Sequence, residues 1–481
     1  MQARQSHLKH APGRAPHAAR LLPALALLAA CSNIGTPAGE LQVGAGRREI
    51  TPTPETAPPA GSVYLGGYGL GPERPSTGVL APIYVRAFVV SGPEGTLAFA
   101  QNETQGAFAA YRSGPFGLRD VARAVEEATG GAIPRSHVIV GSDHSHAGPD
   151  TTGVWGGLPE SYLAFVRDQT VGAIVDAFQA RRPASLWTGA VDASDLVRSQ
   201  FDLPPNDVVD GELRVLLASA PGDPQRPIAA MINYAAHATV MGSGNTLISG
   251  DWPSVVAAGV EAALGIESAV VMVADVGRTQ PERGAGGGAT DPERLEAYGT
   301  LVLERALAAL AAPVAVAGTD VAAEQRFLRE PYGNPLFPLD FLGSIISRAD
   351  TPPWLEDGQV GTVVTTARIG EVFFAAVPGE GYPAIQLAMQ ERVAAAQHFV
   401  FGLANDQLGY LISPEEGYPE VLAAAPDNDN AVFNVSPKIG DHVECSLLAA
   451  ATTLGLDVTP DSTRCGRWAG EDPRLPGEPT S

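Results

Sequence analysis

The chain has 481 residues, and its 53 acidic and 31 basic side chains give a net charge of −22 at pH 7. This acidity argues against nucleic acids and anionic membrane surfaces as partners, because both repel negative charge. The length is ample for one large core, and nothing in the sequence indicates an obligate protein partner.

The first thirty residues are typical of an export signal. A basic region without acids leads into the apolar stretch 21–30, which is too short to span a bilayer. It ends in Leu28-Ala-Ala-Cys31, which resembles the lipobox of bacterial lipoproteins, where the cysteine is lipidated after cleavage. We expect residues 1–30 to be removed and Cys31 to anchor the protein to the bacterial cell envelope, with Ser32 indicating the outer membrane. The alternative is an ordinary secretory signal followed by a coincidental cysteine.

Residues 31–43 are rich in Gly, Pro and Ala and predict a tether. From residue 44, strand-like runs alternate with helical patterns, and this order predicts an α/β fold. We expect a mixed β-sheet core flanked by helices, in one large domain over 44–440.

One part of this pattern is strand–helix–strand, with strands near 97–100 and 137–141 around a helix at 118–128, and it predicts a βαβ unit. Other helices are expected over 161–180, 252–264, 292–311 and 385–396, other strands over 84–90, 213–218, 228–236, 269–274 and 399–403, and a hairpin over 363–376. The stretch 312–360, rich in Pro, Gly and aromatic residues, is expected to be a long excursion near the site.

The segment His137–Pro149 is the most informative motif. An apolar run breaks into a Gly/Ser loop that carries His144 and His146. If the run is a strand, side chains two positions apart point the same way, so both imidazoles can converge on one metal ion. Neutral imidazole is a common ligand of Zn²⁺.

Three further segments end a strand-like run with a side chain that can bind metal: Asn233–His237, Pro378-Gly-Glu380 and Gly409-Tyr410. Each alone is weak, because a lone histidine is more often structural and Pro-Gly-Glu is more often a turn. In open α/β folds, however, sites gather at the carboxyl ends of strands.

Cys445 and Cys465 remain as a pair once Cys31 is lipidated. An exported protein meets an oxidising compartment, so we expect a disulfide that staples the C-terminal segment 441–481. Metal binding by the two cysteines is the weaker alternative, because neither lies near a histidine motif.

Together and in this order, these motifs resemble the neutral/alkaline (non-lysosomal) ceramidase family. The resemblance covers most of residues 44–420. Two of the similar segments are Gly46–Thr51 and Gly67-Tyr68-Gly69. The other four, each with the family's sequence in parentheses, are Asp143–Pro149 (Thr-His-Thr-His-Ser-Gly-Pro), Tyr234–Met241 (Phe-Ala-Ile-His-Pro-Val-Ser-Met), Pro378–Tyr382 (Pro-Gly-Glu-Phe-Thr) and Asn405–Glu416 (Asn-x-Tyr-x-x-Tyr-x-Thr-x-Glu-Glu).

The resemblance implies one Zn²⁺ per chain, held by His144, His237, Glu380 and Tyr410. Such a set leaves a position open for water, whose pKa the ion lowers to ~7, and the ion polarises a carbonyl. The implied reaction is hydrolysis of the N-acyl amide bond of a ceramide-like or other lipid amide by a metal-activated water.

The resemblance also implies catalytic roles. His146 would transfer a proton or stabilise the oxyanion, Arg198 would position the substrate, and Tyr410 would stabilise charge on the attacked carbonyl. Asp251 would orient a metal ligand, although an N-cap of the helix at Trp252 is the simpler interpretation.

One departure concerns the substrate. The family has an active-site Ser where this chain has Gln280, with only the neighbouring Thr279 as a possible replacement. A non-catalytic, lipid-anchored zinc-containing binding protein is therefore the alternative function. Another metal-dependent hydrolase that uses the His-x-His pair in a barrel is less favoured, because few histidines are available.

Overall fold

The computed structural model describes residues 40–58, 62–69, 73–200, 209–334, 347–416 and 429–465. The predicted signal at 1–30, Cys31 and residues 32–39 of the predicted tether lie outside the described residues. The first strand, β1, begins at Leu41, so residues 41–43 belong to the sheet and not to a tether.

The larger sheet is mixed and, among the described residues, nine-stranded, with the order β11-β9-β8-β6-β1-β3-β4-β5 and with β13 paired to β6. Its strands are β1 (Leu41–Glu49), β3 (Tyr84–Ser91), β4 (Thr96–Asn102), β5 (Val138–Ser142), β6 (Arg182–Asp192), β8 (Glu212–Ala220), β9 (Asp223–Tyr234), β11 (Ala269–Val273) and β13 (Val314–Ala315). The pairs β4–β5 and β9–β11 are parallel, and the other pairs are antiparallel. Strand β4 is buried along its whole length, which explains its nearly continuous apolar sequence.

The predicted βαβ unit is confirmed. Helix α1 (Leu118–Ala128) connects β4 to β5, and Ala98 of β4 pairs in parallel with Val138 of β5. The other predicted helices are also present, displaced by at most a few residues at either end: α2 (Glu160–Gln179), α3 (Asp251–Leu264), α4 (Asp291–Ala311) and α6 (Pro383–Arg392).

A second sheet has the order β14-β16-β17-β19, with β15 paired to β16. Its strands are β14 (Val321–Pro331), β15 (Leu355–Glu356), β16 (Gln359–Ile369), β17 (Val372–Ala376) and β19 (Gln397–Phe401). The long excursion predicted over 312–360 contains a strand that was not predicted, because β14 is a regular strand of 11 residues. Most of its residues are only half-buried, which left no clear alternation of apolar and polar side chains in the sequence.

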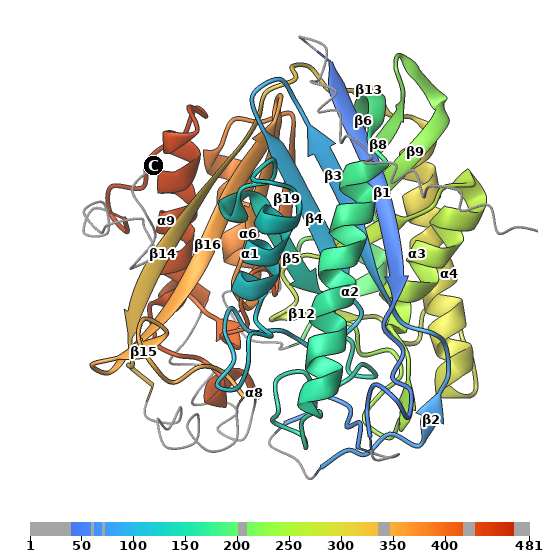
Figure 1. Cartoon of the computed structure of the whole chain (residues 1–481), viewed down its shortest axis with the longest axis vertical. Coiled ribbons are helices and arrows are strands. Elements are labelled where there is room, and N and C mark those ends of the chain that lie inside the picture. Colours follow the sequence, from blue (N-terminus) through green and yellow to red (C-terminus); the bar gives the residue numbers. More distant parts are fainter. Residues whose placement is uncertain are drawn as a thin grey trace, which may run out of the picture. The chain divides into compact units, whose positions relative to one another are not determined.

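The two sheets pack face to face and are covered by helices on their outer faces, as expected for a mixed β-sheet core flanked by helices. Phe88, Phe99 and Met272 of the larger sheet share one core with Phe374 and Phe399 of the smaller sheet. On the far side of the larger sheet, α1 and α2 cover β3–β5, and α3 and α4 cover β8, β9 and β11. Helices α6 and α9 (Ile439–Thr453) cover the smaller sheet (Figure 1).

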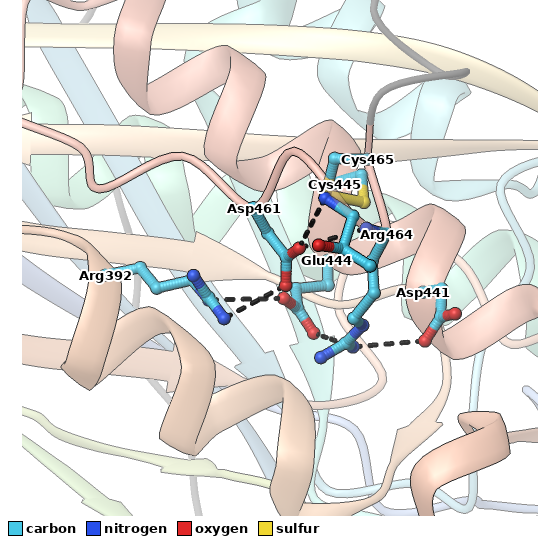
Figure 2. The surroundings of a disulfide bond; sticks show 8 residues. Arg392, Asp441, Glu444, Cys445, Asp461, Arg464 and Cys465 are labelled. Atoms are coloured by element: carbon cyan, nitrogen blue, oxygen red, sulfur yellow. Dashed lines mark hydrogen bonds and ion pairs between the residues drawn. A yellow bond between two sulfur atoms is a disulfide. The ribbon is translucent and has the colours of Figure 1, made fainter.

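The C-terminal segment belongs to this packing. The predicted boundary at residue 441 falls inside α9, which packs against β14 and β16. Cys445 of α9 is joined to Cys465 by a disulfide, as expected from the sequence (Figure 2). Among the described residues, no helix is both long and apolar enough to cross a membrane.

Among the described residues, three short strand pairs lie outside the two sheets. These are β2 (Gly78–Val79) with β10 (Leu247–Ile248), β7 (Val197–Ser199) with β12 (Thr279–Pro281), and β18 (Glu380–Gly381) with β20 (Tyr410–Leu411). Short helices at 414–416 and at Asp429–Val432 (α8) follow β20 in the chain. The loops that carry the predicted site residues follow β5, β9, β17 and β19.

Candidate metal centre

His144 and His146 converge, but not by strand alternation. Strand β5 ends at Ser142, and His144 has a φ of +59°, a left-handed conformation that is uncommon for a residue with a side chain. Ser145 holds the turn, because its Oγ donates to the carbonyl of Ser249 at 2.8 Å. A strained backbone at a candidate site is consistent with a functional constraint on this loop.

His237 reaches the same place from β9. The chain leaves β9 at Tyr234, and the backbone N–H of His237 donates to the carbonyl of Thr279 at 3.0 Å. The side chain of Gln280 lies against the ring, with 3.1 Å between Gln280 Nε2 and His237 Nδ1. Gln280, which stands where the family has Ser, is therefore in direct contact with the predicted metal ligand His237.

Glu380 and Tyr410 lie side by side in the short pair of strands β18 and β20. The two residues are register partners in this parallel pair, and Glu380 N–H also donates to the carbonyl of Gly409 at 2.8 Å. The Tyr410 side chain hydrogen-bonds to the Glu380 carboxylate, and both side chains are buried. The structure thus brings together all four predicted ligands and His146.

The ligand atoms converge on one point. His146 Nε2 lies 3.3 Å from His144 Nε2 and 3.0 Å from His237 Nε2. Glu380 Oε2 lies 3.2 Å from His144 Nε2 and 4.0 Å from His237 Nε2. This oxygen is buried and has no hydrogen-bond partner. Buried imidazole and carboxylate groups that share one focus fit a divalent cation, and this donor set suits Zn²⁺.

The three histidines differ in how their other ring nitrogen is held. His144 Nδ1 lies 2.7 Å from the carbonyl of Gln105, and His237 Nδ1 lies 3.0 Å from the carbonyl of Val276. A carbonyl only accepts, so Nδ1 of each ring is protonated and, in the neutral ring, Nε2 presents a lone pair. His146 Nδ1 is buried without a partner. This contrast favours His144 and His237 as metal ligands and leaves the proton position of His146 free to change.

The pKa directions agree with a site built for positive charge. Burial lowers the pKa of His237 to about 4, and the nearby His144 adds to the effect. Burial, together with His237 and His144, holds the pKa of His146 well below its ordinary value. Burial opposes the charged form of Glu380, but His144, His237 and Tyr410 together outweigh it and lower the pKa of this carboxyl. Burial opposes the charged form of His144, but its ion pair with Glu380 raises the pKa of this ring. At neutral pH the site therefore offers His146 and His237 as neutral imidazoles beside the pair of His144 and the Glu380 carboxylate.

The Gly67-Tyr68-Gly69 turn packs directly against His146. Gly67 has a φ of +91°, and a Cβ at this position would lie 2.2 Å from His146 Nδ1. The Tyr68 ring meets the imidazole edge-on with 4.5 Å between ring centroids. This turn therefore fixes the orientation of His146, a role that the sequence motif alone did not reveal.

Asp251 supports the loop after His237, and it is not the N-cap of α3. The N-cap position is Gly250, and Asp251 is fully buried with a φ of +50°. Its carboxylate accepts from the backbone N–H groups of Val240 and Met241 at 3.2 and 2.9 Å. It thus holds the backbone that follows His237 and does not touch the ring.

Arg198 lies near the centre, but its side chain is half-exposed. It sits on β7 opposite Gln280 of β12, and side chains of opposed residues point to the same face. In the described part of the chain, its guanidinium lies 3.4 Å from the carbonyl of Ser199 and 4.0 Å from the Glu282 carboxylate. The structure does not bring the Arg198 side chain against the histidines.

A pocket opens beside Glu380 and has mostly apolar walls. Its polar lining residues are Gln105, Thr152, Arg348, Asp350, Glu380 and Gln407. Its walls include Phe108, Val154, Trp155, Tyr332, Leu355, Val360, Leu408, Phe433 and Val435. Several of these residues belong to the stretch 312–360, so the prediction that this stretch approaches the site is confirmed. Gln105 and Gln407 were not predicted: Gln105 lies in no motif, and within the segment Asn405–Glu416 only Tyr410 was expected to have a role.

Comparison of the sequence with protein-family models finds no match, and comparison with curated proteins finds none either. Comparison of the structure finds neutral ceramidase from Pseudomonas aeruginosa, with a TM-score of 0.68 and 18% identity, over 89% of this chain and 78% of that chain. A structure of a ceramidase complexed with C2 gives 0.67 and 17% over the same shares of both chains. The chain has the neutral ceramidase fold. The architecture implied by the sequence motifs is therefore confirmed.

Proposed function

We propose that the protein is a zinc-dependent amidohydrolase that cleaves the N-acyl amide bond of a ceramide-like or other lipid amide. The observation that carries the proposal is the convergence of His144 and His237 on Glu380, which itself lines a mostly apolar pocket. The shared fold supports the same class of reaction, because the neighbours of this structure are ceramidases.

In this proposal, His144, His237, Glu380 and Tyr410 hold one Zn²⁺. When bound, the ion supplies Lewis acidity toward a carbonyl oxygen and makes water a nucleophile at neutral pH. The protein's own contribution is orientation: the carbonyls of Gln105 and Val276 fix the two imidazoles, and Tyr410 fixes the carboxylate.

His146 is proposed to transfer the protons of the reaction. Hydrolysis breaks the amide C–N bond, adds the water oxygen to the acyl carbon and delivers a proton to the departing amine. His146 Nε2 faces the centre, and its Nδ1 has no fixed partner, so the ring is suited to gaining and losing a proton. Arg198 is proposed to contact the part of the substrate that lies outside the pocket, because its side chain is half-exposed at the adjoining strand.

The test is an amide panel with the zinc-loaded mature protein. We expect hydrolysis of at least one N-acyl amide with a lipid-like acyl chain, abolished by a chelator and restored by Zn²⁺. Shorter and simpler amides belong in the panel with ceramide, because Gln280 contacts His237 where the family pattern has Ser. A protein that holds stoichiometric zinc and is inert toward the whole panel would support the binding-protein alternative.

The location of the protein is also a proposal. A lipidated Cys31 would hold the domain at the bacterial cell envelope, on the outer membrane, where lipid amides are accessible. Mass spectrometry of the mature N-terminus would show whether Cys31 is the first residue and whether it carries acyl chains.

A further inference from the structure

Gln407 presents an amide oxygen in the pocket that has no hydrogen-bond partner in the protein. Gln407 lines the pocket next to Glu380 and is only 8% exposed. Its Nε2 lies 3.4 Å from Glu380 Oε1, and a carboxylate only accepts, so the amide nitrogen must face Glu380. Gln407 Oε1 then points elsewhere, and it is buried without a hydrogen-bond partner.

The loop that carries Gln407 is held firmly. Its backbone N–H donates to Asp406 Oδ1 at 2.9 Å, and Asp406 is fully buried. Asp406 is itself anchored by Arg348 at 2.7 Å and by the backbone N–H of Ala109 at 2.9 Å. A buried acceptor on a rigid support is a preorganised site for a ligand donor, because an unpaired buried oxygen costs free energy that such a donor recovers.

Gln105, the other glutamine of the pocket, differs from Gln407 in its hydrogen bonding. Gln105 Oε1 already accepts a hydrogen bond from Thr152 Oγ1 at 3.3 Å. Of these two pocket amides, only Gln407 offers a free acceptor. The group that it would recognise is a neutral donor, since the surrounding walls are mostly apolar.

We propose that Gln407 Oε1 accepts a hydrogen bond from the N–H of a secondary amide substrate and that this contact makes the site prefer amides to esters. The inference rests on the proposed function, because it assigns a specificity determinant to the same site. An ester has an oxygen in place of the N–H, so an ester bound in the same pose leaves Gln407 Oε1 unpaired.

The test compares an N-alkyl amide with the ester of the same acyl chain and alkyl group. In Gln407→Met we expect the ratio of kcat/KM for amide to that for ester to fall roughly tenfold. The lost bond from Gln407 Nε2 to Glu380 affects both substrates alike and cancels in the ratio. Gln105→Met is the matched control, and its ratio should stay at the wild-type value. An equal fall for both substrates in Gln407→Met would overturn the proposal.

A second measurement needs no turnover. Calorimetry on the chelated full-length protein compares binding of the secondary amide with binding of its N-methylated form, which lacks the N–H. We expect the wild type to bind the secondary amide roughly tenfold more tightly and Gln407→Met to show no preference. If the loaded enzyme cleaves no amide, the proposed function fails, but the binding comparison still decides the role of Gln407. Equal affinities in the wild type would overturn it.

Discussion

Two buried polar clusters of this molecule have opposite character. Around the disulfide, each acid has a basic partner: Glu444 pairs with Arg464 at 2.5 Å, and Asp461 pairs with Arg392 at 3.0 Å (Figure 2). At the candidate metal centre, by contrast, imidazole lone pairs and Glu380 Oε2 point at one another. The first cluster pairs its acids with arginines, whereas the second gathers imidazoles and a carboxylate around one point that a cation would fill.

This difference explains how a buried structural cluster can be distinguished from a functional one. A self-neutralised cluster satisfies its charges within the protein and contributes to stability alone. A cluster of acceptors carries an electrostatic cost in the free protein, which is the usual mark of a binding or catalytic site. Substitutions in the cluster around the disulfide should therefore affect stability, whereas substitutions at the candidate metal centre should affect zinc binding and turnover.

The largest effect is expected from removing a metal ligand. His144→Ala or His237→Ala should lower zinc affinity by far more than the ~10–100-fold typical of losing a residue that only orients a ligand. Elemental analysis of each purified variant measures this, with circular dichroism to check the fold. Full zinc occupancy in both variants would contradict the assignment.

His146→Ala should separate metal binding from proton transfer. We expect this variant to retain zinc, because His146 Nδ1 lacks the carbonyl partner that holds the other two rings. Turnover should fall about 10²–10⁴-fold, the usual contribution of general acid–base catalysis. Zinc content and kcat measured on the same sample decide the matter. Loss of zinc together with activity would instead make His146 a third imidazole ligand.

Much of the architecture could be predicted from the sequence. The βαβ unit over β4, α1 and β5 follows from clear periodicity, and the convergence of His144, His237 and Glu380 follows from strand–loop motifs whose order resembles that of a known family. Long amphipathic and buried segments carry such signals because their neighbours along the chain share one environment.

Other features depend on contacts between distant segments. Strand β14 shows no clear alternation of apolar and polar side chains, because most of its residues are only half-buried. Its position is set by pairing with β16 over 11 residues. The left-handed conformation of His144 comes from a loop that is fixed by Ser249, more than a hundred residues away. The free oxygen of Gln407 is visible only when its neighbours are placed. These contacts cannot be predicted from local sequence, because they join residues that are far apart in the chain.

The disulfide should affect stability and leave the metal centre unchanged. The two cysteines are separated by 20 residues, and closing a loop of this size is worth about 3 kcal/mol. The double variant Cys445→Ala/Cys465→Ala should therefore lower the free energy of unfolding by roughly this amount in denaturant titrations, with zinc content unchanged. A loss of zinc in this variant would show that the two clusters are coupled through the smaller sheet.

The smallest effect expected is a pH dependence of stability from the cluster around the disulfide. Burial raises the pKa of Glu444 from its ordinary value of 4.5 to about 7, although Arg464 and Arg392 oppose the rise. The folded state therefore binds this proton more tightly than the unfolded state does. The resulting stabilisation is fully present below pH ~4.5 and is lost as the pH rises through about 7.

The neutral variant Glu444→Gln isolates this contribution. Between pH 5 and 8, the free energy of unfolding of the wild type should fall relative to that of Glu444→Gln, by on the order of 1 kcal/mol. Asp461→Asn is a useful control, because backbone hydrogen bonds, chiefly from Arg464, lower the pKa of Asp461, and its contribution is lost only as the pH falls. If the wild type instead gains stability toward pH 8, the two arginines outweigh burial. The cluster would then owe its stability to ion pairing, and its contrast with the metal centre would be sharper still.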